Sequence, residues 1–555
     1  MQWSTPTIIG VDGYYHIKIA WLMAQRGWRI LFPLPFPWMQ LTVLNPREFT
    51  DHHLLFHLLL VPFTTIDLRI GAKLAAVVFA SSALLALYQL LAENRVRLPL
   101  VWLIVAMASA GPFLYRLSMT RRQSLTVLIL LLALLAGFRG RTRWLLPIGF
   151  AFTWLFDGFP LLLGVCGAMF LGLWWEQRRP TWGLILYPAL GVLLGNVIHP
   201  YFPNNILFSY LHMLPKVFQL VGLSHGDDEI RVGNEWYPYN QPFLVESSWL
   251  ALLLVPLGFV PVLLDLRPSR LRRLDGMTIG LGIVAVTFLV LYLRSRRWVE
   301  AEPAFAAAFC AAAWCRAMPS PWPHWRNAWV LAGWLLAAAL MVAALSLLLF
   351  DWTIVAMVGV GVGLAAWFER SAQARLAGPA ADEDRVEQWI RTRLLPHRHT
   401  VLLAIVGIAC LPLLWQSVQS AQNDARGARD FARYRGASTW LVENTPAGAR
   451  VFATDWDDFP ELFYWNTHNT YLIGLDPTYM YLYDGPLYLE WRAITRGQFE
   501  QPSAKLLADF DTGWVFSDLE HDAFIRRAQD DPNMTEVYRD RYTIVFAVKG
   551  WQPRP

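Results

Sequence analysis

Long apolar runs, separated by short segments rich in Arg and aromatic residues, fill the first 418 residues of this 555-residue chain. A helix needs roughly 20 predominantly apolar residues to cross the hydrocarbon core of a bilayer. The runs are near that length, so we predict about twelve membrane-spanning helices. Their approximate ranges are 69–91, 98–115, 123–137, 144–157, 159–175, 182–198, 249–264, 277–293, 303–318, 328–350, 353–368 and 400–418.

After residue 418 the pattern changes to that of a soluble α/β module. A helix is predicted over 425–443 and another around 521–529. Short β-branched and aromatic runs predict strands at 450–453, 471–474, 514–517 and 543–548. The predicted fold class is therefore a polytopic α-helical membrane protein, with a multi-span domain over 1–418 and a C-terminal soluble α/β domain over 419–555.

Two long connections carry many of the polar and aromatic residues outside the predicted spans. The first, 11–66, contains Asp12-Gly13-Tyr14-Tyr15-His16 and Asp51-His52-His53, and the second, 199–248, contains Gly233-Asn234-Glu235-Trp236. Loops of this length are usually functional or disordered. Their aromatic content argues against disorder, so we expect functional loops.

Composition agrees with a membrane protein and excludes several function classes. The chain is 55% hydrophobic and 16% charged, with a mean hydropathy of +0.34, which is too apolar for a soluble protein of this length. The net charge is only +5, and the Arg residues are scattered among apolar runs. This distribution argues against a nucleic-acid partner. All four Cys fall in apolar runs, so neither a disulfide framework nor a zinc site is predicted.

The positions of the Arg residues predict the orientation in the membrane. Loops that carry Arg follow the first, third, fifth, seventh, ninth and eleventh predicted spans, and Lys and Arg are retained on the cytoplasmic side. An even number of spans then places residues 1–68 and 419–555 together on the outer side of the cytoplasmic membrane. Residues 1–10 contain neither a signal peptide nor a span. We therefore expect either a further helix ahead of Met1, for a total of about thirteen, or translocation of a short tail by the next helix.

Two carboxylates in the outer connections are candidates for catalysis. Asp12 precedes the first predicted span at the depth where the head group of a lipid-borne substrate would lie. Glu235 lies in the second connection and could share a divalent ion with Asp12, since hard cations take oxygen ligands. The structural alternative is that Asp12 is an ordinary solvated loop residue.

Two clusters of Arg depart from the orientation rule, because they lie on the predicted outer side. One consists of Arg294, Arg296 and Arg297, and the other occupies 116–122. A phosphate or diphosphate at the same depth would explain them, since guanidinium groups bind phosphoryl oxygens bidentately. Pairing of the first cluster with Glu300 and Glu302 is the alternative.

The C-terminal segment has its own candidate binding surface. Asp455-Trp456-Asp457 follows a predicted strand and forms an acidic and aromatic stretch. Such surfaces bind peptides or sugars by stacking and hydrogen bonds. A packed Trp beside a helix-capping Asp would give the same pattern.

Together these features resemble the GT-C membrane glycosyltransferases, and within them the catalytic subunit of the single-chain bacterial and archaeal oligosaccharyltransferase. The resemblance covers most of the chain as architecture. Asp12-Gly13-Tyr14 matches the acidic signature that opens the first outer loop of this family, and Tyr15-His16 is similar to its archaeal variant. Gly233-Asn234-Glu235 is similar to its flexible loop with a metal-linked Glu, and Asp455-Trp456-Asp457 is similar to its Trp-Trp-Asp motif, with Asp in place of the first Trp.

The resemblance implies roles for individual residues. Asp12 and Glu235 would be catalytic and would hold a divalent cation, Mg²⁺ or Mn²⁺. Arg297 would bind the donor phosphate, and Arg294 is the second candidate for this role. His16 would also contact the donor phosphate.

Two further implications concern the acceptor and the metal. Trp456 and Asp457 would bind the acceptor. The second acidic pair of the family is replaced by a basic string at 116–123, so either Asp51 and His52 complete the metal site or the metal site differs.

The sequence therefore predicts an inverting glycosyltransferase on the outer face. It would move a sugar or oligosaccharide from a polyprenyl phosphate or diphosphate carrier to an acceptor, in protein at Asn or alternatively at a protein hydroxyl or a lipid. Its partners would be the lipid-linked donor, the protein or lipid acceptor and membrane lipid, without nucleic acid. A polytopic transporter or flippase and a non-catalytic membrane scaffold remain as alternatives from other classes.

Overall fold

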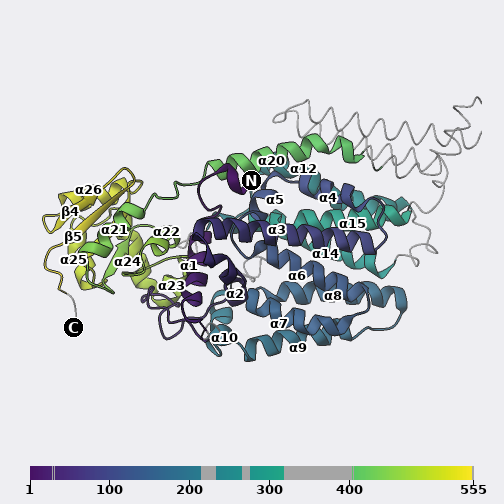
Figure 1. Cartoon of the computed structure of the whole chain (residues 1–555), viewed down its shortest axis with the longest axis horizontal. Coiled ribbons are helices and arrows are strands. Elements are labelled where there is room, and N and C mark those ends of the chain that lie inside the picture. The colour runs from purple at the N-terminus through teal and green to yellow at the C-terminus, as the bar shows by residue number, and fades with distance from the viewer. Residues whose placement is uncertain are drawn as a thin grey trace, which may run out of the picture.

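The computed structural model places a bundle of long helices at one end of the molecule and a small α/β module at the other (Figure 1). It describes residues 1–27, 29, 32–213, 215, 233–264, 275–317, 403 and 406–552. Two short helices, α1 (Asp12–Ala24) and α2 (Leu54–Leu60), lie between the bundle and the module (Figure 1).

The bundle is built from the apolar runs of the sequence. Its helices are α3 (Leu68–Glu93), α4 (Pro99–Ala108), α5 (Gly111–Leu117), α6 (Gln123–Phe138), α7 (Leu145–Leu155), α8 (Phe159–Gln177), α9 (Gly183–Val197), α12 (Gln241–Leu264), α14 (Gly276–Arg294), α15 (Glu302–Ala317) and α20 (Leu411–Arg426). Short 3₁₀ turns lie at Gln2–Ser4, Val61–Thr65, Thr142–Trp144, Asn234–Trp236 and Arg296–Glu300. These apolar helices are those of a multi-pass membrane protein.

The count of about twelve spans is not confirmed. Within the described residues, four helices (α3, α8, α12 and α14) are long and apolar enough to cross a membrane, and the pair α4 and α5, bent by 98°, would be a fifth. The runs at 123–137, 144–157 and 182–198 form helices shorter than 18 residues. The predicted spans at 328–350 and 353–368, and the first part of that at 400–418, lie outside the described residues.

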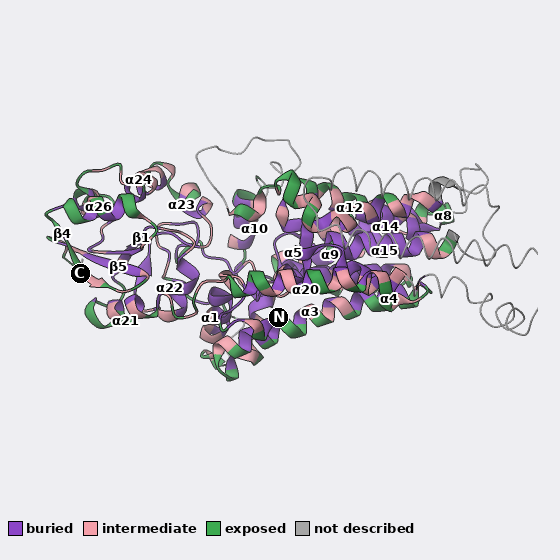
Figure 2. Cartoon of the chain, turned by 90° about the horizontal axis from the view of Figure 1, so that it is seen from above, coloured by how far each residue is buried: buried purple, intermediate pink, exposed green. Residues whose placement is uncertain are grey.

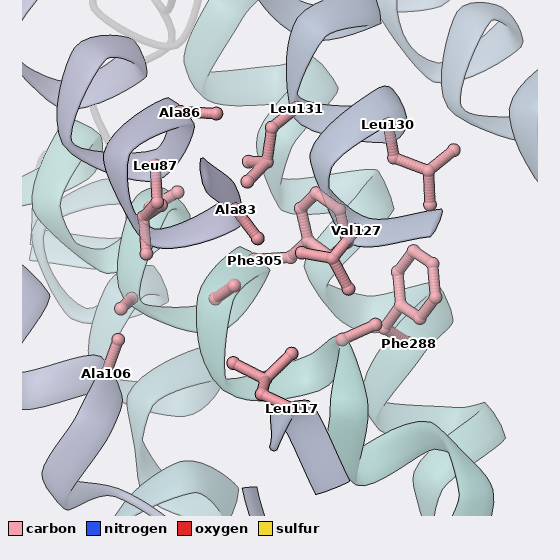
Figure 3. Packing of buried hydrophobic residues seen from close by; sticks show 14 of the residues in the cluster. Ala83, Ala86, Leu87, Ala106, Leu117, Val127, Leu130, Leu131, Phe288 and Phe305 are labelled. Atoms are coloured by element: carbon pink, nitrogen blue, oxygen red, sulfur yellow. The ribbon is translucent and has the colours of Figure 1, made fainter. Parts of the chain in front are cut away.

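Small and large apolar side chains interlock in the core of the bundle. Ala83 and Ala86 on α3 lie beside Leu131 on α6 in Figure 3, and all three are nearly inaccessible to solvent. The rings of Phe288 on α14 and Phe305 on α15 stack there with centroids 4.7 Å apart. Figure 2 shows the buried residues along the inner faces of the bundle helices. This packing holds the helix ends that carry the polar residues described below.

The connections predicted as loops contain helices. Besides α1 and α2, the stretch 199–248 contains α10 (Asn204–Phe208), a π-helical turn (Ser209–Met213) and the beginning of α12. The prediction was wrong because these helices are short and carry polar residues amid aromatic ones, whereas helices are recognised in sequence by sustained periodicity. Residues 214 and 216–232 of the second connection lie outside the described residues.

The C-terminal module is a five-stranded mixed sheet with helices around it. The strands are β1 (Arg450–Ala453), β2 (Thr470–Tyr471), β3 (Trp514–Asp518), β4 (Met534–Arg539) and β5 (Thr543–Val548), in the order β2-β1-β3-β5-β4. β1 is parallel to β2 and β3, and β5 is antiparallel to β3 and β4. The helices are α21 (Arg435–Asn444), α22 (Phe459–Trp465), α23 (Thr478–Tyr483), α24 (Gly485–Thr495), α25 (Pro502–Ala508) and α26 (Asp522–Asp530).

The strand predictions for this module are largely confirmed. β1 and β5 have the predicted bounds, and β2, β3 and α26 differ from them by a few residues. The predicted helix over 425–443 is instead the end of α20 followed by α21. β4 was not predicted because its side chains are mostly polar and exposed, so it lacks an apolar alternation.

Aromatic side chains dock the module onto α1. The Tyr14 ring lies 5.4 Å from that of Tyr464 on α22, and the Tyr15 ring lies 5.6 Å from that of Phe463. Helix α20 runs through the predicted domain boundary at residue 418 and buries Leu413 and Ala421 in the structure. The module therefore sits directly over the start of α1.

Candidate active site at the start of α1

Two glycines let the start of α1 approach the loop between α5 and α6. Gly10 has φ = +84°, a conformation that favours glycine. A Cβ at Gly13 would lie 2.7 Å from Ile8 Cγ2 and 3.1 Å from Thr120 Cβ. The backbone N–H of Thr120 donates to the carbonyl of Ile9 over 3.3 Å. This close approach brings the guanidinium of Arg121 against α1.

The packing at Gly13 gives a test of this arrangement. We expect Gly13→Ala to lower the unfolding free energy by about 1–3 kcal/mol through overpacking, which outweighs the gain of at most about 1 kcal/mol in helix propensity. A lower thermal unfolding midpoint in detergent would measure it. Gly164→Ala is the matched control, because nothing lies within 4 Å of a Cβ at that helical glycine. A Gly13→Ala midpoint at or above that of the control would contradict the assignment.

Arg121 links the two carboxylates that the sequence singled out. One of its amino nitrogens lies 2.7 Å from the Asp12 carboxylate, and the other lies 3.1 Å from that of Glu235. Arg116 donates to Glu235 over 2.9 Å and to Glu300 over 3.0 Å. Asp12 and Glu235 are therefore close together, as predicted, with a guanidinium group between them.

Two further arginines make fewer ion pairs with carboxylates than Arg116 and Arg121 do. Arg297 lies 3.4 Å from Glu235, and its guanidinium carbon is 4.7 Å from the centre of the Trp236 ring. Arg122 is 6% exposed, and its guanidinium carbon is 3.5 Å from the centre of the Phe156 ring. Among the described residues, no carboxylate lies within 4 Å of Arg122, and its buried Nε has no hydrogen bond. A buried cation without a paired anion is costly, so this site favours an anionic ligand.

Burial and charge set the ionisation of these groups. Burial raises the pKa of Glu235, but Arg121 and Arg116 outweigh it and hold that pKa at about 2. Burial raises the pKa of Asp12, and Arg121 opposes the rise. Burial lowers the pKa of Arg122 to about 10, which leaves it charged at neutral pH. The cluster thus combines an ionised Glu235 with cationic arginines.

Asp12 and Arg121 stand in the wall between two cavities. The first cavity has a volume of about 700 Å³, and its lining combines three arginines with four histidines: Arg121, Arg122, Arg297, His16, His52, His53 and His212. The second has a volume of about 810 Å³ and reaches the C-terminal module at Arg429, Asp457 and Glu461. Both cavities are also lined by Asp12. A group bound in either cavity can therefore reach its carboxylate.

The second cavity is acidic on the side of the module. Arg429 lies 3.4 Å from Asp457 and 3.9 Å from Glu461. Burial raises the pKa of Asp457 to about 6 and that of Glu461 to about 7, with Arg429 opposing both shifts. These side chains could accept hydrogen bonds from a polar group of an acceptor.

The histidines of the first cavity are held in two ways. His16 Nδ1 lies 2.8 Å from His57 Nε2, and His57 Nδ1 lies 2.7 Å from the Asp51 carboxylate. The His52 ring stacks on Phe208 with centroids 4.6 Å apart. Burial lowers the pKa of His52 to about 3 and that of His16 well below its ordinary value. The imidazoles of His16 and His52 are therefore neutral at physiological pH.

The structure brings most of the predicted site residues together, but not all of them. Asp12, Glu235, Arg297, His16 and His52 line the first cavity, and Asp457 lines the second.

Three predicted residues lie elsewhere. Asp51 contacts His57 and does not line the first cavity. Arg294 is exposed at the end of α14, and Trp456 lines neither cavity. Trp456 nevertheless lies near the second connection, 3.7 Å from the position of a Cβ at Gly233. Within the described residues, the alternative pairing of the 294–297 arginines with Glu300 and Glu302 is not found, and Glu300 pairs with Arg116.

Comparison with solved structures decides the fold. The chain is similar to the archaeal oligosaccharyltransferase AglB from Archaeoglobus fulgidus, in complex with an inhibitory peptide and a dolichol-phosphate, with 13% identity and a TM-score of 0.56 over 100% of this chain and 72% of that chain. The chain has the GT-C fold.

Two further GT-C structures are similar over nearly the whole chain. ArnT from Cupriavidus metallidurans in the apo state has 15% identity and a TM-score of 0.48 over 98% of this chain and 94% of that chain. ArnT bound to undecaprenyl phosphate has 14% identity and a TM-score of 0.49 over 99% of this chain and 96% of that chain. Neither a family model nor a curated protein matches the sequence.

The residues proposed as ligands of a divalent cation do not form one ligand set in this GT-C chain. Arg121 binds Asp12 and Glu235, His57 binds Asp51, and His52 stacks on Phe208. Within the described part of the chain, no three His, Cys, Asp or Glu side chains gather as metal ligands. A guanidinium thus provides the positive charge between the two carboxylates, and Mg²⁺ or Mn²⁺ stays a prediction.

Sequence reasoning missed several residues of this site. It offered the arginines at 116–122 as a cluster that a phosphate would explain, but it also treated the basic string at 116–123 as a departure from the GT-C family pattern and gave Arg121 and Arg122 no individual role. The signal was present, because three arginines on a predicted outer loop need anionic partners. Asp476 and Tyr479 also line the first cavity, but no motif marks them, since only the docking of the module places them there.

Proposed function

We propose that this protein is a glycosyltransferase of the outer membrane face, which takes a sugar or oligosaccharide from a polyprenyl phosphate or diphosphate carrier and attaches it to an acceptor. One observation carries the proposal: a cavity lined by Arg122, whose guanidinium pairs with no carboxylate among the described residues, meets a second cavity at one carboxylate, Asp12. Transfer between two substrates requires such a junction.

In this proposal the first cavity holds the phosphate of the donor. Arg122 and Arg297 would bind its oxygens and stabilise the negative charge that develops as the glycosidic bond breaks. The AglB structure of the same fold holds a dolichol-phosphate, which supports a polyprenyl-linked donor for this chain.

The second cavity would hold the acceptor. Asp457 and Glu461 would orient its polar groups, and Asp12 would accept a hydrogen bond from the attacking N–H or O–H. The acceptor could be an Asn in protein, as in an oligosaccharyltransferase, or a protein hydroxyl or lipid, as the altered Asp455-Trp456-Asp457 motif leaves open.

The helix ends support the proposed sidedness. Arg121 and Arg122 precede α6, and Phe156 and Asp157 follow α7, so the site lies at one end of this pair of antiparallel helices. The Arg-rich loops at 139–143 and 178–179 connect the opposite ends, where Trp144 and Trp182 are exposed. Exposed Trp is typical of a membrane interface on either side, and Arg-rich short loops are typical of the cytoplasmic side.

Transfer of radiolabelled sugar by the purified protein, from a polyprenyl-linked donor to a peptide or a lipid, tests the proposal. Product in either acceptor would support a glycosyltransferase and identify the acceptor class. Movement of the donor across a vesicle membrane without any product would support a flippase instead. Neither transfer nor movement, together with binding of peptide to the C-terminal module, would support a scaffold.

Removal of divalent ions is expected to leave transfer within about twofold of its original rate, because Arg121 already bridges Asp12 and Glu235 and neutralises them. The measurement is the initial rate after chelation with EDTA and exchange into metal-free buffer. A loss of tenfold or more that added Mg²⁺ or Mn²⁺ restores would contradict this expectation and support the divalent cation predicted from the sequence.

A further inference from the structure

Three buried side chains form a hydrogen-bonded chain that ends in the first cavity. The Asp51 carboxylate lies 2.7 Å from His57 Nδ1, and His57 Nε2 lies 2.8 Å from His16 Nδ1. All three residues are at most 5% exposed. Only His16 lines the cavity.

When both imidazoles are neutral, the hydrogen bonds fix their tautomers. Burial would favour neutral Asp51, but His57 and the backbone N–H of His53 outweigh it and hold the pKa of Asp51 below its ordinary value. The ionised Asp51 can only accept, so His57 donates from Nδ1. His57 Nε2 then accepts the Nδ1 proton of His16. The lone pair of His16 therefore lies on Nε2, which makes no hydrogen bond within the described part of the chain.

His16 is also well placed relative to Asp12. The two residues are four apart on α1 and lie on one face of the helix. Asp12 is held in an ion pair with Arg121 at 2.7 Å, and uptake of a proton by its carboxylate would remove the charge that holds this pair. Arg121 and Arg122 line the same cavity as His16, but within the described part of the chain neither makes a hydrogen bond with its imidazole, which can accept a proton there.

We propose that His16 Nε2 accepts the proton of the acceptor during transfer, with His57 and Asp51 as positioning residues that hold its tautomer. This inference rests on the proposed function. It changes the role of His16 from a contact to the donor phosphate, as the sequence suggested, to the base that receives the proton.

The step balances without a further reactant. The acceptor N–H or O–H bond breaks and its proton goes to His16 Nε2, while the freed electron pair forms the bond to the anomeric carbon. The bond from that carbon to the phosphate oxygen breaks, and its electron pair leaves with the phosphate beside Arg122 and Arg297. The Nδ1 proton of His16 can then shift to His57 Nε2, which places the positive charge next to Asp51.

The surroundings keep His16 neutral before the reaction. Burial lowers its pKa most, followed by His57, Arg121 and Arg122. The ionisable groups that face it are His57, His53, His52, Arg121, Arg122 and Asp12. Because only the neutral form is a base, transfer should decline as pH falls through the pKa of His16.

The test compares the full-length protein with His16→Gln, Asp51→Asn and the control His468→Gln, which alters a histidine of the C-terminal module that lines neither cavity. We expect His16→Gln to lower kcat by about 10²-fold or more, with the donor KM unchanged. Asp51→Asn should lower kcat by about tenfold or more. It should also move the acid limb of the pH profile to lower pH, because the imidazoles lose their negative partner. The control should behave as wild type.

The outcomes separate the two proposals. Wild type that transfers no sugar to any acceptor overturns the proposed function and this inference with it. Wild-type transfer combined with full activity of His16→Gln, or with an unmoved acid limb in Asp51→Asn, overturns the inference alone. A purely structural role would lower the unfolding midpoint of both variants without moving the acid limb. ¹⁵N chemical shifts of the imidazoles test the tautomers independently of activity.

Discussion

Replacing Asp12 with Asn should reduce glycosyl transfer by roughly 10²- to 10³-fold. The carboxylate is the one acidic group that lines both cavities in the described part of the chain. Asn has nearly the same shape, so the start of α1 and its contacts with Thr120 should persist. The amide cannot orient the attacking N–H or O–H as strongly as a charged oxygen can. It also leaves the charge of Arg121 without its 2.7 Å partner.

The measurement is the transfer rate at saturating donor and acceptor, with expression and the unfolding midpoint as checks. Glu246→Gln is the matched control, since this exposed residue lies before the apolar part of α12 and lines neither cavity. Activity of Asp12→Asn above a tenth of wild type, in protein of normal stability, would remove Asp12 from the reaction.

Replacing Arg122 with Gln should weaken donor binding by roughly 10- to 100-fold, because charge-assisted hydrogen bonds contribute about 1.5–3 kcal/mol. Arg122 is buried over the Phe156 ring, has no carboxylate within 4 Å among the described residues, and keeps a buried Nε without a hydrogen bond. A phosphate oxygen would satisfy that donor. In the absence of ligand, removal of this unpaired charge should leave stability unchanged or raise it.

The readout is the donor KM together with the unfolding midpoint, each measured with and without polyprenyl phosphate. Arg294→Gln is the matched control, because Arg294 carries the same charge near the same depth but is exposed and lines neither cavity. Equal donor KM values for the two variants would show that Arg122 does not bind the phosphate. A loss of stability in ligand-free Arg122→Gln would show that its role is structural.

The clustering of the two carboxylates could be predicted from the sequence better than the details of the site. Asp12 and Glu235 were predicted to share a site, and both contact Arg121. A divalent cation was predicted between them because hard cations take oxygen ligands and normally need more than one acidic group, and it stays a prediction. The arginine that lies between them was present in the sequence, but its distance from either carboxylate along the chain gave no sign of contact.

One physical reason explains why some predicted site residues lie outside the cavities. The orientation of a side chain depends on the helix face that the core accepts, which a short motif does not specify. Arg294 ends α14 on its exposed face, whereas Arg297 follows a turn at Ser295 and is buried. Asp51 and His57 are six residues apart, and only the bend before α2 brings them to hydrogen-bond distance.

The sequence by itself determined that the first domain lies in a membrane, and it determined the class of fold and most strands of the C-terminal module. These follow from the spacing of apolar residues over a few turns of helix or a few strand positions, and that spacing is local. The tertiary structure decided which charges meet. The ion pair of Arg116 with Glu235 spans 119 positions of sequence, and it forms because α1, the loop at 118–122 and the turn at Asn234–Trp236 pack at one end of the bundle. Such contacts depend on the whole packed core, since no local pattern specifies them.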